Sequence, residues 1–340
     1  MGERTLIVPE RRGPATVPCL DPFASLSAEE RALLRPEPVP ARVVPMRAVL
    51  TDEPFSDPAW IFERKLDGVR CVAIRADGGV RLRSRNDLSL NAGFPGVAEA
   101  LAARASEPLV VDGELVAFAR GRTSFARLQQ RGERHVDVFL YLFDLLHLAG
   151  QDTTALPLRA RKALLRRAVS FGGPLRFTPH RRSAGEALFR EACRRGWEGV
   201  IAKRADAPYT RGRSRDWLKL KCSAEQELVI GGYTAPRGSR TDLGALLVGY
   251  YDRGRLRYAG KVGTGFTRAT LRDLVARLAP LERGDSPFAD AIREPRVTWV
   301  EPRLVAQIGF SEWTRDGRLR HPRFLGLRED KAAEEVVRER

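Results

Sequence analysis

A change in strand pattern near residue 222 constrains the fold of this chain more than any other feature. Before it, long apolar segments alternate with helical patterns, whereas after it short strands are separated by glycines and turn signals such as Asp252-Arg253-Gly254. The first pattern is typical of an α+β domain and the second of a small β-barrel. A chain of 340 residues can give each part its own core. We therefore predict two domains, residues 42–222 and 223–340.

The first domain combines a strand meander with helices. A turn at Asp77-Gly78-Gly79 joins two strand patterns, and Pro95 stands where a first helical turn would start. Ser183 and Gly196 have the positions of a helix cap and a helix stop. Strands are expected at 62–65, 69–74, 80–85, 109–118, 136–146, 199–203 and 217–221, and helices at 95–104, 160–169 and 184–195.

Two of these strands carry carboxylates inside apolar runs, at Asp112 and Glu114 in one and at Asp144 in the other. Such interruptions cost stability unless each carboxylate has a partner. The second domain is expected to contain one helix and five strands. Its strands are 228–234, 244–251, 256–262, 297–301 and 304–310, and its helix is 269–278.

Residues 1–41 form an extension rich in proline, arginine and glutamate. Their one helical signal, at 28–34, follows Ser27, which has capping-box spacing to Glu30. The extension could be a docking or DNA-contacting arm, but a poorly ordered segment explains its composition better.

The chain is strongly basic and uses lysine sparingly. Its formal charge is +16, and only seven of its 59 basic residues are lysine. This charge suits a polyanion such as nucleic acid or a triphosphate, although arginine enrichment from a biased genome explains part of it. An ammonium, unlike a guanidinium, can lose its proton and act as a nucleophile. The lysines are therefore the first candidates for chemistry: Lys65, Lys162, Lys203, Lys219, Lys221, Lys261 and Lys331.

Cysteine and hydropathy patterns exclude several classes of protein. The four cysteines, Cys19, Cys71, Cys193 and Cys222, are widely separated and lack CxxC spacing, so we expect neither a structural zinc site nor a disulfide framework. The most apolar run, residues 138–150, is too short to span a bilayer, and no signal peptide opens the chain. These patterns predict a reduced cytoplasmic protein with no membrane partner.

A K-x-D-G-x-R pattern lies where the strand at 62–65 runs into a turn. Lys65 could point into a cleft, Gly68 would let the backbone approach a ligand, and Arg70 would offer a planar fork to phosphate. Taken alone, so short a pattern is better explained by a surface turn with a salt bridge. The motifs elsewhere in the chain decide between the two explanations.

Together the motifs resemble those of the covalent nucleotidyltransferases, and most closely the compact bacterial ATP-dependent DNA ligases that serve as modules of end-joining systems. The resemblance covers roughly residues 43–335 and includes a closing stretch at 320–331. Chance does not explain six motifs in the family's order. They are Lys65 to Arg70, Ser84-Arg85-Asn86, Asp112-Gly113-Glu114, Phe143-Asp144, Glu198 to Lys203, and Trp217 to Lys221.

The resemblance implies an α+β fold, with a nucleotidyltransferase (adenylation) domain followed by a C-terminal OB-fold. It also implies ATP and Mg²⁺ as cofactors, with Mn²⁺ as a substitute, and Lys65 as the nucleophile that becomes AMP-lysine. Lys203, Lys219 and Lys221 would lower the pKa of Lys65 and stabilise charge on the phosphate. For Lys219 and Lys221 the alternative is one exposed strand face.

Other residues acquire roles by the same resemblance. Glu114 and Glu198 would hold the metal, although a strand-edge salt bridge is an alternative for Glu114. Glu63 would accept a hydrogen bond from the adenine amino group, and Phe143 would stack on the base, where core packing is its alternative. Arg85 would contact ribose or a DNA 5′-phosphate, as would Arg70.

Two further positions raise structural questions. The family often has glycine where this chain has Asp87, which puts the local turn in doubt. Arg328 and Lys331 lie in the second domain beside Asp330, so their expected contact with the outer phosphates of ATP requires the domains to close. An ordinary basic tail is the alternative.

We therefore expect a monomeric ATP-dependent DNA ligase that acts in repair on nicked or broken duplex DNA at the nucleoid, with a DNA end-binding protein as a further partner. An RNA ligase or a GTP-using capping enzyme is the nearest rival. An inactive OB-type nucleic-acid-binding protein is a rival from another class. An NAD⁺-dependent ligase is disfavoured because the chain has no four-cysteine zinc module.

Overall fold

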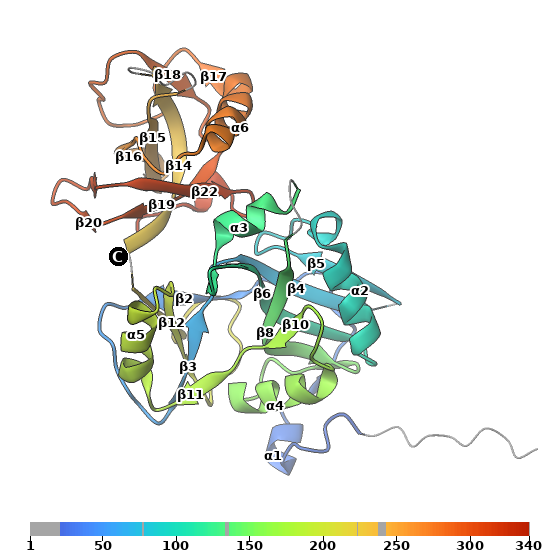
Figure 1. Cartoon of the computed structure of the whole chain (residues 1–340). Coiled ribbons are helices and arrows are strands. Elements are labelled where there is room, and N and C mark those ends of the chain that lie inside the picture. Colours follow the sequence, from blue (N-terminus) through green and yellow to red (C-terminus); the bar gives the residue numbers. More distant parts are fainter. Residues whose placement is uncertain (1–20, 77, 133–135, 223, 237–242, 340) are drawn as a thin grey trace, which may run out of the picture.

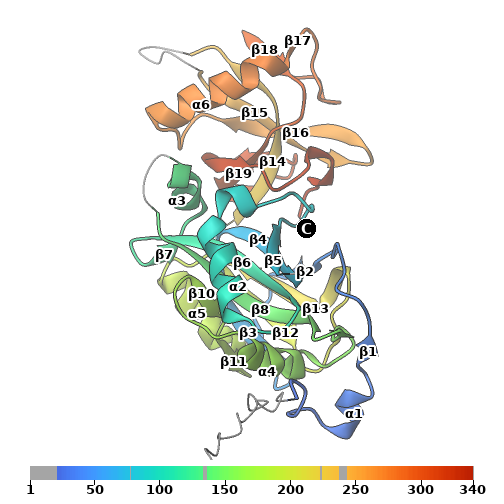
Figure 2. The ribbon, with the colours of Figure 1, turned by 90° about the vertical axis from the view of Figure 1, so that its right-hand side faces the viewer.

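The computed structural model describes residues 21–76, 78–132, 136–222, 224–236 and 243–339 (Figure 1). Its strands form two large sheets before residue 222 and a third sheet after it. We call these parts the two-sheet unit and the C-terminal unit, and Figures 1 and 2 show one stacked on the other. Mixed sheets with few helices confirm the predicted α+β class.

The first sheet has the strand order β1-β9-β8-β6-β4-β5, with β10 beside β8 and β7 beside β6. Helices α2 and α4 contribute to the apolar core on one face of it. Its strands are β1 (Arg35–Pro36), β4 (Val69–Ala76), β5 (Gly79–Arg83), β6 (Leu109–Ala119), β7 (Arg122–Thr123), β8 (Val138–Leu148), β9 (Gln151–Asp152) and β10 (Leu175–Phe177).

The second sheet has the order β11-β3-β12-β13-β2, and helix α5 packs on its outer face. A further apolar cluster, which includes Val72, Phe143 and Trp217, joins the inner faces of the two sheets. The two sheets therefore face each other. The strands are β2 (Met46–Leu50), β3 (Trp60–Lys65), β11 (His180–Arg182), β12 (Gly199–Arg204) and β13 (Gly212–Lys221).

The helices largely follow the sequence patterns. They are α1 (Ala28–Arg31), α2 (Pro95–Arg104), α3 (Phe125–Gln129), α4 (Leu158–Ala168), α5 (Gly185–Arg194) and α6 (Arg268–Leu278), with 3-10 turns η1 (Asn91–Gly93), η2 (Gln130–Gly132), η3 (Ala279–Leu281) and η4 (Ala333–Glu335). The predicted cap of α5 is wrong: Ser183 has a φ of 56°, and the backbone N–H of Glu186 donates instead to the Ser56 hydroxyl at 3.2 Å.

The C-terminal unit is built around β14, which pairs with β15, β18 and β19. Helix α6 packs against the core of this sheet. The strands of this sheet are β14 (Ala224–Thr234), β15 (Leu246–Asp252), β16 (Arg255–Val262), β17 (Glu282–Arg283), β18 (Val297–Val300), β19 (Val305–Phe310) and β22 (Arg323–Arg328). Strands β20 (Glu312–Trp313) and β21 (Leu319–Arg320) pair with each other in a separate small sheet.

Residues 21–41 are packed against the two-sheet unit, which corrects the expectation of a poorly ordered segment. Phe23 and Leu26 are buried in its core, and β1 pairs with β9. The capping box of Ser27 and Glu30 is confirmed at the start of α1. Residues 1–20 of the predicted extension lie outside the described residues.

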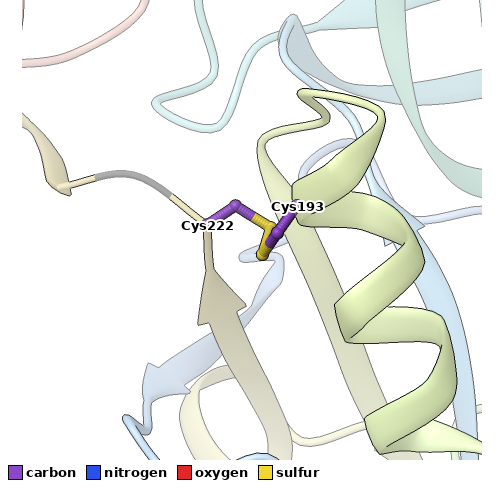
Figure 3. The surroundings of a disulfide bond; sticks show 2 residues. All are labelled: Cys193 and Cys222. Atoms are coloured by element: carbon purple, nitrogen blue, oxygen red, sulfur yellow. A yellow bond between two sulfur atoms is a disulfide. The ribbon is translucent and has the colours of Figure 1, made fainter.

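The expectation of no disulfide is also wrong. Cys193, at the end of α5, is bonded to Cys222, which follows β13, and their Cα atoms are 5.0 Å apart (Figure 3). The two cysteines are separated by 29 positions, so no short cysteine spacing in the sequence indicated that they pair. Cys71 is a buried free thiol.

In the part of the chain that the structure describes, no helix is long and apolar enough to cross a membrane.

Candidate active site

Strand register brings one set of motif residues onto a single face of the second sheet. Antiparallel pairing sets Lys65 of β3 opposite Gly199 of β12, and Gly199 opposite Lys221 of β13. Because side chains alternate along a strand, positions two residues apart share this face. The face therefore carries Glu63 and Lys65 from β3, Lys203 from β12, and Trp217, Lys219 and Lys221 from β13.

The first sheet supplies the opposite wall. A β-bulge lies between Asp112 and Gly113 where β6 pairs with β8, and it leaves Phe143 without a directly paired partner. Bulges redirect side chains, and here Phe143 is directed toward Trp217, with ring centroids 5.9 Å apart. Phe143 is at once a core residue and a wall of the cavity.

A cavity of about 210 Å³ lies between the sheets and extends to the C-terminal unit. The twelve side chains to which the sequence assigned a role in the site all line it, which brings together residues of every motif, whereas Lys162 and Lys261 do not line it. The twelve are Glu63, Lys65, Arg70, Arg85, Glu114, Phe143, Glu198, Lys203, Lys219, Lys221, Arg328 and Lys331. Their individual roles remain predictions.

At the inner end of the cavity, the Glu63 carboxylate is buried between two lysines. Its oxygens lie 2.5 Å from Lys162 Nζ and 2.7 Å from Lys203 Nζ. Burial raises the pKa of Glu63, but the two lysines outweigh it and the net pKa is lowered. Burial lowers the pKa of Lys203 to about 8 despite Glu63. The oxygens expected to meet adenine are thus already bound to ammonium groups.

Lys203 also lies against two aromatic rings. Its Nζ is 4.1 Å from the ring centroid of Phe143 and 4.0 Å from that of Trp217. A cation at these distances from a ring face is attracted by the ring quadrupole. The expected base-stacking surface of Phe143 is therefore shared with an ammonium group.

Arg70 lines the cavity, but most of its fork is already engaged. Its Nε and Nη2 each donate to the Asp112 carboxylate at 2.6 Å, and Nη2 also donates to the Met46 carbonyl. Tyr209 donates its hydroxyl to the same carboxylate at 2.6 Å. Asp144 is paired likewise, because Arg161 donates to it at 2.7 Å and 3.0 Å. Both of these strand carboxylates thus have the partners that burial requires.

The Lys65 ammonium donates to the Glu198 carboxylate. Burial lowers the pKa of Lys65, but Glu198 outweighs it and the net pKa is raised. The predicted lowering by neighbouring lysines is therefore wrong for this arrangement, because an anion is the nearest partner of Lys65. Burial raises the pKa of Glu114 to about 7.

At the outer end, the C-terminal unit inserts a carboxylate between two lysines. The Glu339 oxygens accept from Lys219 Nζ and Lys221 Nζ, each at 2.6 Å. Burial raises the pKa of Glu339, but the lysines outweigh it and lower the pKa to about 2. Gln226 holds the tail in place by accepting from the Glu339 N–H at 3.1 Å and donating to the Val337 carbonyl at 2.9 Å.

The closing motif faces the cavity from the C-terminal unit. Lys331 donates to Glu227 at 2.8 Å, and Arg328 donates to Asp330 at 2.9 Å and 2.8 Å. The alternative of an ordinary basic tail does not hold, since all four side chains line the cavity. The two units therefore meet over the cavity.

Backbone geometry accounts for the residues found at two turn positions, Asp87 and Gly68. Asp87 has a φ of 66°, a left-handed conformation that glycine adopts freely and that aspartate tolerates, so the turn beside Arg85 forms despite the carboxylate. Two guanidinium nitrogens of Arg85, Nε and Nη2, are buried without a hydrogen-bond partner among the residues that the structure describes. A Cβ at Gly68 would overlap the Leu115 carbonyl of β6, which by itself requires glycine there, while the expected approach of its backbone to a ligand stays a prediction.

Sequence reasoning assigned no role to two residues that bind members of the site. Lys162 of α4 binds Glu63 across 99 positions, and its only signal was the scarcity of lysine. Glu339 lies beyond the last motif and had no signal. Both act through partners distant in sequence, which no local pattern reveals.

Glu114 and Glu198 fit a magnesium site that is completed by phosphate. Both line the same cavity. The described residues contain no cluster of three His, Cys, Asp or Glu side chains able to hold a metal by themselves. Mg²⁺ is commonly held by one or two carboxylates together with substrate phosphates and water, so a pair suffices.

Two family descriptions match this chain. Residues 45–221 match the ATP dependent DNA ligase domain, and residues 239–331 match the ATP dependent DNA ligase C terminal region. A solved structure of mycobacterial DNA ligase D complexed with ATP and MES has 37% identity and a TM-score of 0.65, over 87% of this chain and 98% of that one. The predicted adenylation domain and C-terminal OB domain are thereby confirmed.

The curated relatives of this chain include proteins named LigD. The multifunctional non-homologous end joining protein LigD of Pseudomonas aeruginosa is 39% identical over 351 residues, which cover 100% of this chain and 41% of the relative. The multifunctional non-homologous end joining DNA repair protein LigD of Mycobacterium tuberculosis is 40% identical over 288 residues, 82% of this chain and 37% of the relative. The chain thus spans about two-fifths of these relatives. Since the ligase-domain match alone covers more than half of its residues, this chain belongs to the ATP-dependent DNA ligase family.

Proposed function

We propose that Lys65 is the nucleophile of a three-step ligation. Its ε-nitrogen, after losing a proton, attacks the α-phosphate of ATP, and the bond to the β-phosphate breaks with release of pyrophosphate. AMP then passes from Lys65 to the 5′-phosphate of a nick, which frees the lysine. The 3′-hydroxyl attacks that 5′-phosphate, a phosphodiester forms, and AMP leaves. We also propose that residue 41 ends the N-terminal extension and that residue 222 ends the first of the two domains.

The other residues act on charge and position. Lys219 and Lys221 bind the α-phosphate where charge develops, and Arg328 and Lys331 bind the outer phosphates. The unpaired guanidinium nitrogens of Arg85 suit a phosphate, while Glu63, Phe143 and Lys203 define the base end of the cavity. Glu114 and Glu198 would hold Mg²⁺, which when bound neutralises charge on the transferred phosphate.

One observation carries this proposal: the register of β3, β12 and β13 sets Lys65 on the same face as Lys219 and Lys221, where its ammonium donates to Glu198. The test is acid-labile labelling with α-labelled ATP. We expect Lys65→Ala and Lys65→Arg to abolish labelling, because neither offers a deprotonated amine. Normal labelling of either variant would show that another residue is the nucleophile. Labelling by GTP in place of ATP would favour a capping enzyme. A chase of the labelled protein with nicked DNA, RNA and hybrid duplexes would identify which nucleic acid accepts AMP.

We further propose a role in DNA end joining at the nucleoid, supported by the names of the LigD relatives. The net charge of +16 suits duplex DNA, although DNA alone does not explain which breaks are sealed. Under this proposal a DNA end-binding protein raises sealing of double-strand ends more than sealing of nicks. Equal sealing with and without such a protein would contradict it.

A further inference from the structure

Helix α3 of the two-sheet unit touches the C-terminal unit beside the closing motif. Figure 1 shows α3 next to β22, and Figure 2 shows it at the junction of the two units. The guanidinium carbon of Arg328 lies 4.3 Å from the ring centroid of Phe125, the first residue of α3. The ring is 5% exposed, so this cation–π contact is shielded from water.

A second contact joins the same helix to the same strand. Gln129 donates its side-chain amide to the Leu327 carbonyl of β22. Gly326 makes room for it, because a Cβ at that position would lie 2.5 Å from Gln129 Oε1. Both ends of α3 therefore meet the short stretch of β22 that ends in Arg328.

The other side of α3 is fixed to the turn that follows Lys65. The Asp67 carboxylate accepts from the Phe125 N–H at 2.9 Å, and the Asp67 N–H donates to the Thr123 hydroxyl at 3.1 Å. Leu128 is fully buried in the core of the first sheet. The helix thus connects the nucleophile turn to Arg328 through two hydrogen bonds and one ring contact.

Phe125 does not line the cavity around Lys65, whereas Arg328 does. It therefore acts through Arg328 and is a positioning residue. Arg328 has a second partner in Asp330, which fixes its fork from within its own unit. From the two-sheet unit, Phe125 makes a direct ring contact with the guanidinium, and Glu114 of β6 attracts the same guanidinium by its charge.

We propose that α3, through Phe125 and Gln129, positions Arg328 over the cavity for the first step, the transfer of AMP to Lys65. The inference rests on the proposed role of Lys65. For the later steps a DNA 5′-phosphate must reach Lys65, and a cavity of about 210 Å³ covered by the C-terminal unit has no room for a duplex. The units must then separate, and the contact between Phe125 and Arg328 is absent from those steps.

The test separates the two halves of the reaction in the full chain. Phe125→Leu keeps an apolar side chain but removes the ring face, and Gln129→Ala removes the second contact from a partly exposed position. We expect single-turnover formation of lysyl-AMP to fall about tenfold in the first variant and about threefold in the second. Sealing of a nick that already carries AMP on its 5′-phosphate should be unchanged. Phe118→Leu, the same change on β6 at a ring that packs on Phe139, is the control and should alter neither rate.

The inference is supported if both variants slow the formation of lysyl-AMP and neither slows the sealing of a nick that already carries AMP. An equal fall in both steps would overturn it, because the helix would then merely support the fold. Unchanged lysyl-AMP formation in both variants would also overturn it. If the wild-type chain formed no lysyl-AMP at all, the proposed function would fail and this inference with it, so the two failures are distinguishable.

Discussion

The two ends of the cavity combine lysines and a carboxylate in contrasting ways. At the inner end Glu63 lies between Lys162 and Lys203, and all three side chains belong to the two-sheet unit. At the outer end Glu339 lies between Lys219 and Lys221, but here the carboxylate belongs to the C-terminal unit. The inner cluster therefore persists whenever the first unit is folded, whereas the outer cluster exists only when the units are closed.

This difference indicates which lysines are available to a substrate. The inner ammonium groups are 2–3% exposed, while those of Lys219 and Lys221 are 16% and 12% exposed. Under the proposed function, the Glu339 carboxylate that accepts from both outer lysines occupies the position of phosphate oxygens of ATP. The inner cluster thus supports the fold, and the outer cluster is exchangeable.

The largest expected effect is on stability and concerns the inner cluster. Glu63→Gln would leave two buried ammonium groups without a counter-charge, and breaking a buried ion pair in this way costs about 3–5 kcal/mol. Chemical denaturation of the two-sheet unit should therefore shift to a markedly lower midpoint.

The matched control is Glu312→Gln, since Glu312 and its partner Arg320 are 57% and 60% exposed. Exposed pairs contribute at most about 1 kcal/mol, so this change should barely alter the midpoint. Similar losses in the two variants would contradict the distinction between a structural and an exchangeable cluster.

The sequence predicted what local patterns encode. Turn signals and glycine spacing located the strands of both units, and alternation placed Lys219 and Lys221 on one face. The motifs predicted that Lys65 and Glu198 would share a site, and β3 and β12 do pair there. Each of these inferences depended on residues a few positions apart or on a motif already known as a unit.

What could not be predicted depends on contacts between distant segments. Lys162 reaches Glu63 because α4 packs on the first sheet, and Glu339 reaches β13 because the tail crosses from the C-terminal unit. Cys193 and Cys222 meet because α5 ends beside the end of β13. No periodicity or spacing specifies such pairs, so they appeared only with the three-dimensional structure.

The outer lysines should also respond to pH. Burial lowers the pKa of Lys219 to about 8, so its charge is lost as pH rises through that value. ATP binding to the outer lysines should therefore weaken as pH rises from 7 to 9, by up to about tenfold, because about a tenth of Lys219 remains protonated at the upper limit.

Equilibrium ATP binding in a Lys65→Ala background would measure this effect without AMP transfer. Adding Lys219→Arg should flatten the dependence, because a guanidinium stays charged throughout the range. An equally steep loss of affinity in the arginine variant would assign the pH dependence to another group.

The smallest expected effect tests whether Glu339 competes with phosphate. Glu339→Gln keeps the size of the side chain and leaves the backbone N–H free to donate to Gln226, but it removes the charge that pairs with Lys219 and Lys221. The KM for ATP in lysyl-AMP formation should fall about three- to fivefold, which corresponds to about 1 kcal/mol. The control is Glu334→Gln, which removes the same charge. Glu334 is an exposed residue of the same tail and does not line the cavity. If both variants lower the KM alike, the effect is one of net charge. If Glu339→Gln raises the KM, the carboxylate assists ATP binding, and the outer cluster is as structural as the inner one.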